Sequence, residues 1–132
     1  MKRALMAVVA ALLSGNALAS PVYLSCHVGS GDHRTDFKVT LDENNGTATQ
    51  TEGGSFSADA SFDPTEVRYM RRDYHDWGRH GSQTFLMITR INRVDLSVTY
   101  EYKYLENGQV KPEKGYIKKG QCKVITPPSR KF

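Results

Sequence analysis

The sequence predicts an all-β protein: a small antiparallel meander of about seven or eight strands, folded as a curled sheet or a closed barrel. Apolar and polar residues alternate with a period of two over several short runs, as they do when a strand presents every second side chain to a core. Residues that favour turns separate these runs. Beyond the first 19 residues, no stretch of about twelve residues carries a helical stripe.

The strands follow from these runs in chain order. Alternation is clearest over residues 22–28, 37–41, 56–62 and 94–104, whereas residues 85–91 are more evenly apolar. An evenly apolar run of this length is consistent with a central strand that is covered on both faces. We therefore expect 85–91 to lie between two other strands.

Three turn signals connect the runs. Asn44-Asn45-Gly46 separates two strands, and Asn107-Gly108 precedes a short segment at Val110. Asn and Gly readily adopt the positive φ of a tight hairpin turn, so we expect a hairpin at Asn107-Gly108. The third signal, Asp63-Pro64-Thr65-Glu66, fits either a type I turn or the cap of a single helical turn.

The start of the chain has the order of a cleavable export signal. Met1-Lys2-Arg3 is basic, residues 4–13 are apolar, and Ala17-Leu18-Ala19 ends in small residues at the cleavage positions. The apolar run is shorter than the roughly 20 residues of a spanning helix. We predict a signal peptide over 1–19, a single β domain over 20–126 and a flexible tail over 127–132, located in the periplasm or secreted. The alternative is an uncleaved membrane anchor.

Charge and cysteine content narrow the functional classes. Loss of Lys2 and Arg3 leaves 16 basic and 14 acidic residues, a net charge of +2, which is not typical of a nucleic-acid-binding protein. The two cysteines, Cys26 and Cys122, predict one disulfide joining the first strand to the last. A reactive or metal-binding cysteine pair is the alternative.

Residues 69–81 form the most unusual segment, which we expect to be a loop between two strands. It holds the only tryptophan and two of the four histidines. Aromatic and arginine side chains dominate binding hot spots, because they supply rigid contact area and several hydrogen bonds. The candidate binding residues are Arg71, Arg72, Tyr74, His75, Trp77, Arg79 and His80. The alternative is a long hairpin loop whose tryptophan folds back on the core.

The same segment offers a metal site as an alternative. Asp73, His75, Asp76 and His80 are possible ligands, and a metal-assisted hydrolase would use the two histidines. The sequence contains no recognised catalytic motif, so we predict a protein without catalytic residues, metal or other cofactor.

Three tyrosines, Tyr100, Tyr102 and Tyr104, form a stripe on one face of a predicted strand. We interpret this stripe as core or cross-strand packing, with a ligand platform as the alternative.

Several short motifs carry a resemblance. They are Leu24-Ser25-Cys26, Phe37 to Glu43, Phe62-Asp63-Pro64, Ile91-Asn92-Arg93 and Gly120 to Cys122 before a basic tail that ends in Phe132. In this arrangement the chain resembles a group of small, uncharacterised exported proteins of Gram-negative bacteria and their phages. The resemblance implies a β-rich periplasmic domain and no particular activity.

A looser resemblance is to the periplasmic lysozyme inhibitors, in size, export, disulfide and β-barrel architecture. Their signature is a Ser-Gly-x-x-Tyr loop that enters the lysozyme cleft. Beyond the predicted signal peptide the only Ser-Gly is Ser30-Gly31, which is followed by Asp32-His33-Arg34, so the tyrosine is missing.

Together these observations predict a binding or interaction module whose partner is a periplasmic protein or another envelope component. The alternatives are a structural or stress-related envelope protein and a lysozyme-inhibitor-like protein. The oligomeric state and the strand order are not predicted.

Overall fold

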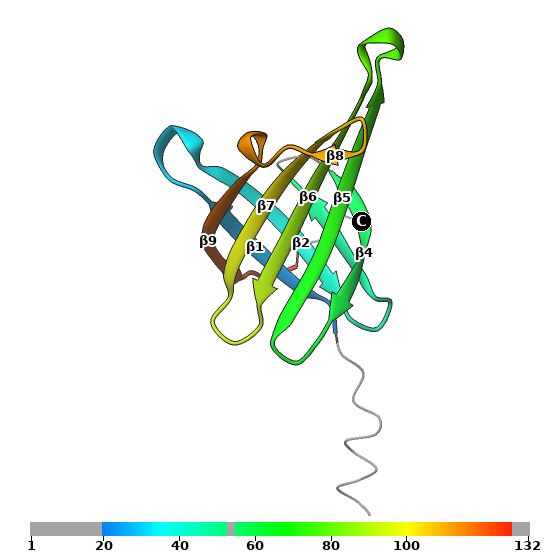
Figure 1. Cartoon of the computed structure of the whole chain (residues 1–132). Helices are drawn as coiled ribbons and strands as arrows, with labels where there is room; N and C mark the ends of the chain where they lie inside the picture. The colour runs from blue at the N-terminus through cyan, green and yellow to red at the C-terminus, as the bar shows by residue number, and fades with distance from the viewer. Residues whose placement is uncertain (1–19, 53–54, 128–132) are drawn as a thin grey trace, which may run out of the picture.

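The computed structural model describes residues 20–52 and 55–127, which form a closed antiparallel barrel (Figure 1). The predicted signal peptide and most of the predicted tail lie outside the described residues. The strands are β1 (Val22–Val28), β2 (Thr35–Asp42), β3 (Thr47–Thr51), β4 (Phe56–Phe62), β5 (Glu66–Asp76), β6 (Ser82–Asn92), β7 (Ser97–Glu106), β8 (Gln109–Val110) and β9 (Tyr116–Val124). Short 3₁₀ turns lie at Gly31–His33 (η1), Gly78–His80 (η2) and Pro112–Lys114 (η3). No helix among these residues is long and apolar enough to cross a membrane.

Eight strands close the barrel as a meander. Each strand from β1 to β7 pairs with the next, β9 pairs with β7, and the pairing of β9 with β1 completes the ring. The extra strand, β8, pairs with the far end of β7 through the Asn107-Gly108 turn, where both residues have the expected positive φ of 52° and 80°. The predicted all-β class and strand number are confirmed, and the closed barrel is the alternative that the structure adopts.

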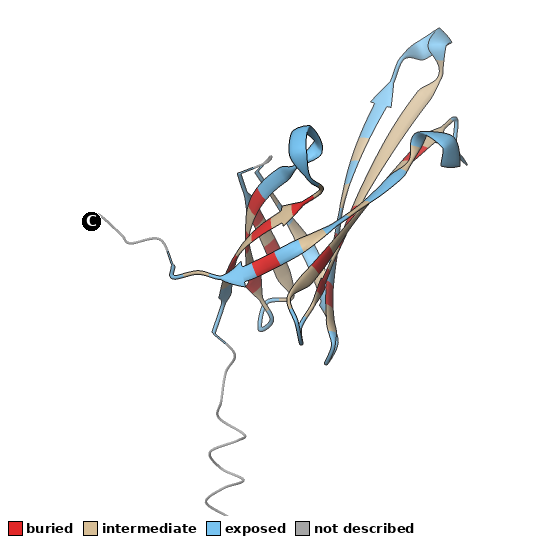
Figure 2. Ribbon diagram, turned by 90° about the vertical axis from the view of Figure 1, so that its left-hand side faces the viewer, coloured by how far each residue is buried: buried red, intermediate tan, exposed pale blue. Residues whose placement is uncertain are grey.

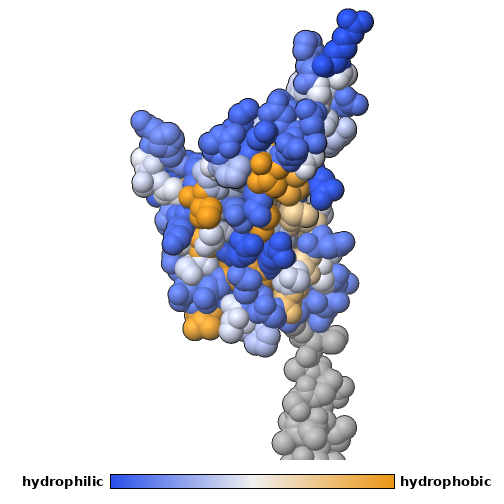
Figure 3. Space-filling view, viewed as in Figure 1, coloured by the Kyte–Doolittle hydropathy of each residue, from blue (hydrophilic) through white to orange (hydrophobic). Residues whose placement is uncertain are grey.

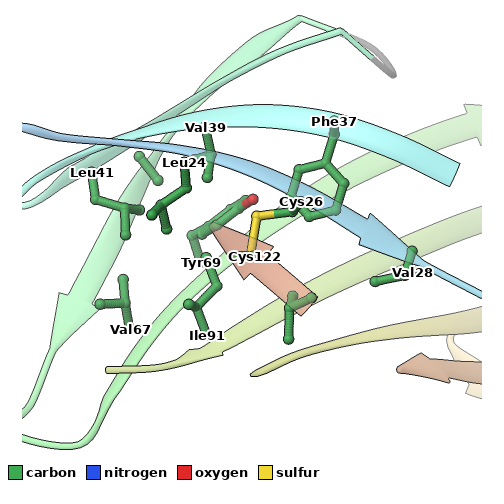
Figure 4. Close-up of a cluster of buried hydrophobic side chains, with 12 residues drawn as sticks. Leu24, Cys26, Val28, Phe37, Val39, Leu41, Val67, Tyr69, Ile91 and Cys122 are labelled. Atoms are coloured by element: carbon green, nitrogen blue, oxygen red, sulfur yellow. A yellow bond between two sulfur atoms is a disulfide. The ribbon is translucent and has the colours of Figure 1, made fainter. Parts of the chain in front are cut away.

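Alternate residues of the strands fill the interior, as the sequence pattern predicts. The buried core is drawn in Figure 4, and in Figure 2 the buried positions gather in the body of the barrel. One buried polar pair crosses this core: the hydroxyl of Tyr69 donates a hydrogen bond to Oε1 of Gln50 at 2.9 Å. Burial raises the pKa of Tyr69 above the usual tyrosine range. The interior therefore holds a fixed polar bond among its apolar side chains.

The disulfide lies inside this core. Cys26 on β1 is directly opposite Cys122 on β9, and the bond between them spans a sequence separation of 96 residues. Nearby, a Cβ atom added to Gly120 would collide with the carbonyl oxygen of His27, so only glycine permits this close approach of β9 to β1. The predicted joining of the first and last strands is confirmed.

The end of the barrel near the start of β1, which we name the aliphatic end, is lined by branched side chains. Leu24, Leu41, Val67 and Ile91 line a hollow of about 230 Å³ there. At its rim, Nη2 of Arg93 contacts Oε2 of Glu43 at 2.9 Å. The ion pair bridges two connecting loops.

The segment Asp63-Pro64-Thr65-Glu66 at this end is a turn, not a helical cap. Oδ1 of Asp63 accepts hydrogen bonds from the backbone N–H groups of Thr65 (2.9 Å) and Glu66 (2.7 Å). These bonds favour the charged carboxylate and lower the pKa of Asp63.

Two predicted boundaries are wrong. Residues 69–81 are not a loop, because β5 and β6 pair without interruption from Glu66–Asn92 to Asp76–Ser82 and leave only five residues for the turn. The hairpin projects beyond the barrel (Figure 1), where both faces meet water and the apolar alternation is lost. The predicted strand 94–104 begins only at Ser97, because Asn92 Oδ1 accepts the N–H groups of Val94 and Asp95 and forms a turn.

A candidate binding surface at the aromatic end of the barrel

The opposite end of the barrel, from which the β5–β6 hairpin projects, is lined by aromatic side chains. We name this the aromatic end. Strand register places the rings on one inner face: Phe85 on β6 is opposite Tyr104 on β7, and Tyr102 on β7 is opposite Tyr116 on β9. Because strands alternate their side chains, the intervening residues of these strands face outward.

The rings form a continuous series of contacts, which we name the aromatic run. From the hairpin turn inward, it comprises Trp77, His75, Phe85, Tyr104, Tyr102, Tyr116 and Tyr100. Ring centroids of neighbours lie 4.9 to 6.4 Å apart, and the shortest of these distances joins the stacked rings of Tyr102 and Tyr116. These separations lie within the range of favourable aromatic pairs. The run therefore connects the projecting hairpin to the barrel interior.

At its inner end the run reaches a cavity of about 90 Å³. Rings of Phe56, Tyr100 and Tyr116 line the cavity, together with the polar side chains of Gln50 and Thr89. This volume is below the roughly 150 Å³ of an engineered cavity that binds benzene, so it accommodates only a small group. A wider hollow of about 430 Å³ lies beside Tyr102, Tyr104 and Tyr116, next to η3. The surface is a shallow groove with a small inner recess. On the outside of the molecule, Figure 3 shows a mostly hydrophilic face below the hairpin with a few apolar patches.

Three cations lie over aromatic rings at this end. The guanidinium carbon of Arg71 is 5.1 Å from the ring centre of Phe56. Nζ of Lys114 is 4.7 Å from the ring centre of Tyr104, and Nζ of Lys118 is 5.3 Å from that of Tyr116. Such contacts are attractive and hold each cation against the face of its ring.

Each of these cations also has a polar neighbour within the chain, and for Lys114 it is Glu106. Nε of Arg71 lies 3.3 Å from Oδ1 of Asp73, and Nζ of Lys118 donates a hydrogen bond to the carbonyl oxygen of His33 at 2.9 Å. The second contact draws η1 and the adjacent Ser30-Gly31 to the same end of the barrel. The aromatic end thus combines rings with cations held in place.

The hydroxyls of Tyr100 and Tyr102 stay protonated well above neutral pH. Burial, with a smaller contribution from Tyr116 and Tyr102, raises the pKa of Tyr100 to about 12. Burial also raises the pKa of Tyr102. At neutral pH these hydroxyls are therefore uncharged hydrogen-bond donors and acceptors.

The structure separates the seven predicted binding residues into three groups. Arg71 and His75 lie on the inner face, and Trp77 continues it at the turn. Arg72 and Tyr74 lie on the opposite face of β5, and Arg79 and His80 occupy η2 at the tip. The prediction treated one segment as one surface, but the alternation of a strand divides it.

Trp77 does not fold back on the core. Its side chain is 53% exposed and stacks on His75 with ring centres 5.6 Å apart.

The three tyrosines of the stripe differ in burial. Tyr104 is 7% exposed and belongs to the core, whereas Tyr100 and Tyr102 are half-buried and line the groove.

Sequence reasoning missed Phe85, Tyr116 and Lys118. Phe85 was assigned to an evenly apolar strand, although Gln83, Phe85 and Met87 alternate with the same period as Tyr100 to Tyr104. Tyr116 and Lys118 lie beyond a turn, and only the register of β9 with β7 brings them to the run.

Among the residues that the structure describes, no three His, Cys, Asp or Glu side chains are grouped so that they could hold a metal ion. In particular, Asp73, His75, Asp76 and His80 do not converge. Comparison with protein-family models, with curated proteins and with solved structures finds no match to this chain.

Proposed function

We propose that the mature chain is a binding module that acts outside the cytoplasm, and that the aromatic end is its binding surface. The partner is a protein or another component of the cell envelope. The observation that carries the proposal is the aromatic run, which extends from a half-exposed tryptophan to a recess inside the barrel. The sequence of residues 1–19 and the disulfide support an exported protein.

The placement of the rings favours binding over core formation. His75 and Trp77 lie on the part of the hairpin beyond the pairing of β5 with β4, so they add little to the barrel core. Large rings lose little conformational entropy when they are immobilised, and they supply much contact area for each residue. A partner that lies along the groove would cover rings that are now partly exposed to water.

The cations extend this surface to partners with acidic groups. Arg71 borders the recess and Lys114 lies over Tyr104, so both ends of the groove carry a positive side chain. Both also have a carboxylate neighbour within the chain, Asp73 for Arg71 and Glu106 for Lys114. An acidic partner would therefore compete for pairs that are already formed, and ring contacts would supply most of the affinity.

The test is capture of a partner from the periplasm by the mature protein and by two pairs of variants. Trp77→Ala removes the outer ring of the run, and Tyr23→Ala removes an aromatic side chain from the outer wall of β1 as a matched control. Arg79→Ala at the tip is matched by Arg68→Ala on the outer face of β5. We expect the Trp77 and Arg79 variants to lose the captured component and both controls to retain it.

A second readout follows from the composition. Trp77 is the only tryptophan, so its emission reports directly on occupancy of the aromatic end. Addition of the captured component should shift the emission of the wild-type protein. Retention of the component by Trp77→Ala, or an unchanged emission on binding, would contradict the proposal.

A further inference from the structure

The outer edge of β5 has a long unpaired section. β4 pairs with β5 at only three positions, Ala60–Tyr69, Ser61–Arg68 and Phe62–Val67. From Met70 to Asp76, β5 pairs with β6 on one side and with no strand of residues 20–52 or 55–127 on the other. Figure 1 shows this section rising above the barrel in the hairpin. A free edge of this length is a template for pairing with another strand.

The hydrogen bonds at both ends of β5 identify which backbone groups face outward. The N–H of Trp77 donates to the carbonyl oxygen of Gly81 across the hairpin, whereas the carbonyl oxygen of Glu66 accepts from Asp63 on the other side. Backbone groups of an antiparallel strand alternate between its two neighbours. The outward groups are therefore those of the even-numbered residues Met70, Arg72, Tyr74 and Asp76.

Two of the residues whose backbone groups face this free edge, Arg72 and Asp76, have charged side chains without an ion pair among the described residues. Arg72 has no ion pair or hydrogen bond from its side chain among the described residues, and Asp76 uses only Oδ1, which accepts the N–H of Gly78 at 2.9 Å. Tyr74 lies between them on the same face and is 61% exposed. The edge thus presents a positive residue, an aromatic residue and a negative residue at alternate positions.

We propose that this edge pairs with the same edge of a second copy of the chain, antiparallel, with a two-fold axis at Tyr74. In this register Arg72 of each copy is opposite Asp76 of the other, the two tyrosines are opposite each other, and Asp73 is opposite His75. Cross-strand pairs of opposite charge and of aromatic rings stabilise a sheet. The interface is isologous, as expected for a closed dimer.

The other registers of this edge are less favourable. An axis at Arg72 would place the two unpaired arginines opposite each other, and its attractive pair, Arg71 opposite Asp73, joins residues that already form an ion pair within each chain. An axis at Asp73 would place two aspartates opposite each other. Like charges at such positions are destabilising. An axis at His75 would leave Arg72 opposite Gly78 in the turn, without a carboxylate. Charge complementarity therefore selects the register centred on Tyr74.

The dimer would join the two hairpins into one four-stranded ribbon. A two-fold axis perpendicular to a sheet keeps the inner faces of both copies on the same side, so both aromatic runs would face the same way. The proposal goes beyond the binding function and stands on the edge of β5 alone. It holds or fails whether or not the aromatic end binds a partner.

The test uses charge exchange in the full mature chain, with mass measured by sedimentation velocity over a range of concentrations. Arg72→Asp places carboxylates opposite each other at both charged pairs, and Asp76→Arg places guanidinium groups there. Each single variant should therefore remain monomeric where the wild type is dimeric. The two variants mixed in equal amounts restore attraction and should form a heterodimer. A chain carrying both changes should again form a homodimer.

One control variant and three contrary results complete the test of the dimer. Arg68→Asp lies on the same face of β5 but within its pairing with β4, so it should leave the dimer intact. Near-ultraviolet circular dichroism verifies that each variant is folded. A wild-type chain that is monomeric at every concentration would overturn the proposal, as would a dimer that survives both single substitutions or a mixture that stays monomeric.

Discussion

The two ends of the barrel differ in what fills the space between the strands. At the aliphatic end, Leu24, Val67 and Ile91 are 1–2% exposed and belong to one buried cluster. At the aromatic end, the inward positions carry rings, an arginine and a lysine around an open recess. The β5–β6 hairpin then continues into solvent with polar residues on both faces. Figure 2 shows the same contrast, because exposed and intermediate residues dominate the projecting hairpin.

This difference indicates a division of tasks within one small domain. Apolar burial and the disulfide are concentrated in the body of the barrel, so the stability of the fold does not depend on the hairpin. The aromatic end is consequently free to expose rings and unpaired strand edges, which would be costly in a core. Local stability commonly varies in this way, with binding elements drawn from the less stable parts. Four predictions test the division, from the largest expected effect to the smallest.

The disulfide should make the largest contribution. Replacement of Cys26 and Cys122 by alanine frees a loop of 96 residues in the unfolded chain, for which we expect a loss of about 4 kcal/mol in the free energy of unfolding. Urea unfolding of the oxidised wild type and the double variant measures this loss. A decrease below about 1 kcal/mol would mean that the barrel closes without the covalent bond and that the strand pairing of β1 with β9 suffices.

Truncation at the aliphatic end should come next. Ile91→Ala shortens a branched side chain that is 1% exposed, and we expect a loss of about 3 kcal/mol. Val94→Ala is the matched control in the following turn, where the side chain is 79% exposed and the change should stay within about 0.5 kcal/mol. Similar losses for the two variants would remove the distinction between core and surface at this end.

Alkaline pH should reveal the raised pKa of Tyr100, the tyrosine at the inner end of the aromatic run. The folded-state pKa of Tyr100, about 12, lies above the ordinary value of 10.0, so its contribution to stability is complete below pH 10 and is lost as pH rises towards 12. Two pKa units would correspond to about 2.7 kcal/mol, but the ring is only half-buried, and we expect a loss of about 1 kcal/mol. Urea unfolding at a series of alkaline pH values measures it.

Tyr100→Phe supplies the control for this pH dependence. The variant keeps the ring and lacks the ionising hydroxyl, so its stability should fall less steeply between pH 10 and pH 12 than that of the wild type. Tyr69 also titrates above its usual range and remains in both proteins. An identical decline in the two proteins would mean that burial does not raise the pKa of Tyr100 and that its hydroxyl makes no pH-dependent contribution to stability.

The sequence predicts the body of the barrel better than its aromatic end, for a physical reason. In the body, one face of each strand is buried, so residues 22–28 and 37–41 alternate visibly and the strands are correctly located. Where β5 leaves the barrel, both of its faces meet water, the alternation disappears, and residues 69–81 read as a loop. The predicted strand boundary at Val94 failed because a side chain–backbone turn at Asn92 leaves no mark in the hydrophobic pattern.

The candidate site could be predicted only in part. Composition identified His75, Trp77 and Arg71, which do lie along one face. Phe85 and Tyr116 join them through strand register, which is a relation between distant segments and which no local pattern encodes. The pairing of the two cysteines was predictable because a chain with two cysteines can form only one intramolecular disulfide.

The smallest effect on stability is expected at the outer end of the aromatic run. Trp77 is 53% exposed and contacts His75, so Trp77→Ala should change the free energy of unfolding by no more than about 0.5 kcal/mol. Tyr104→Ala is its counterpart within the same run, where the ring is 7% exposed, and should cost about 3 kcal/mol. Urea unfolding of both variants compares the exposed outer end of the run with a buried ring of the same run. A loss above about 2 kcal/mol for Trp77→Ala would place the hairpin turn in the folding core, and the tryptophan would then be retained for stability instead of binding. A negligible loss, together with the loss of partner capture, would show that this end of the barrel can change without cost to the fold.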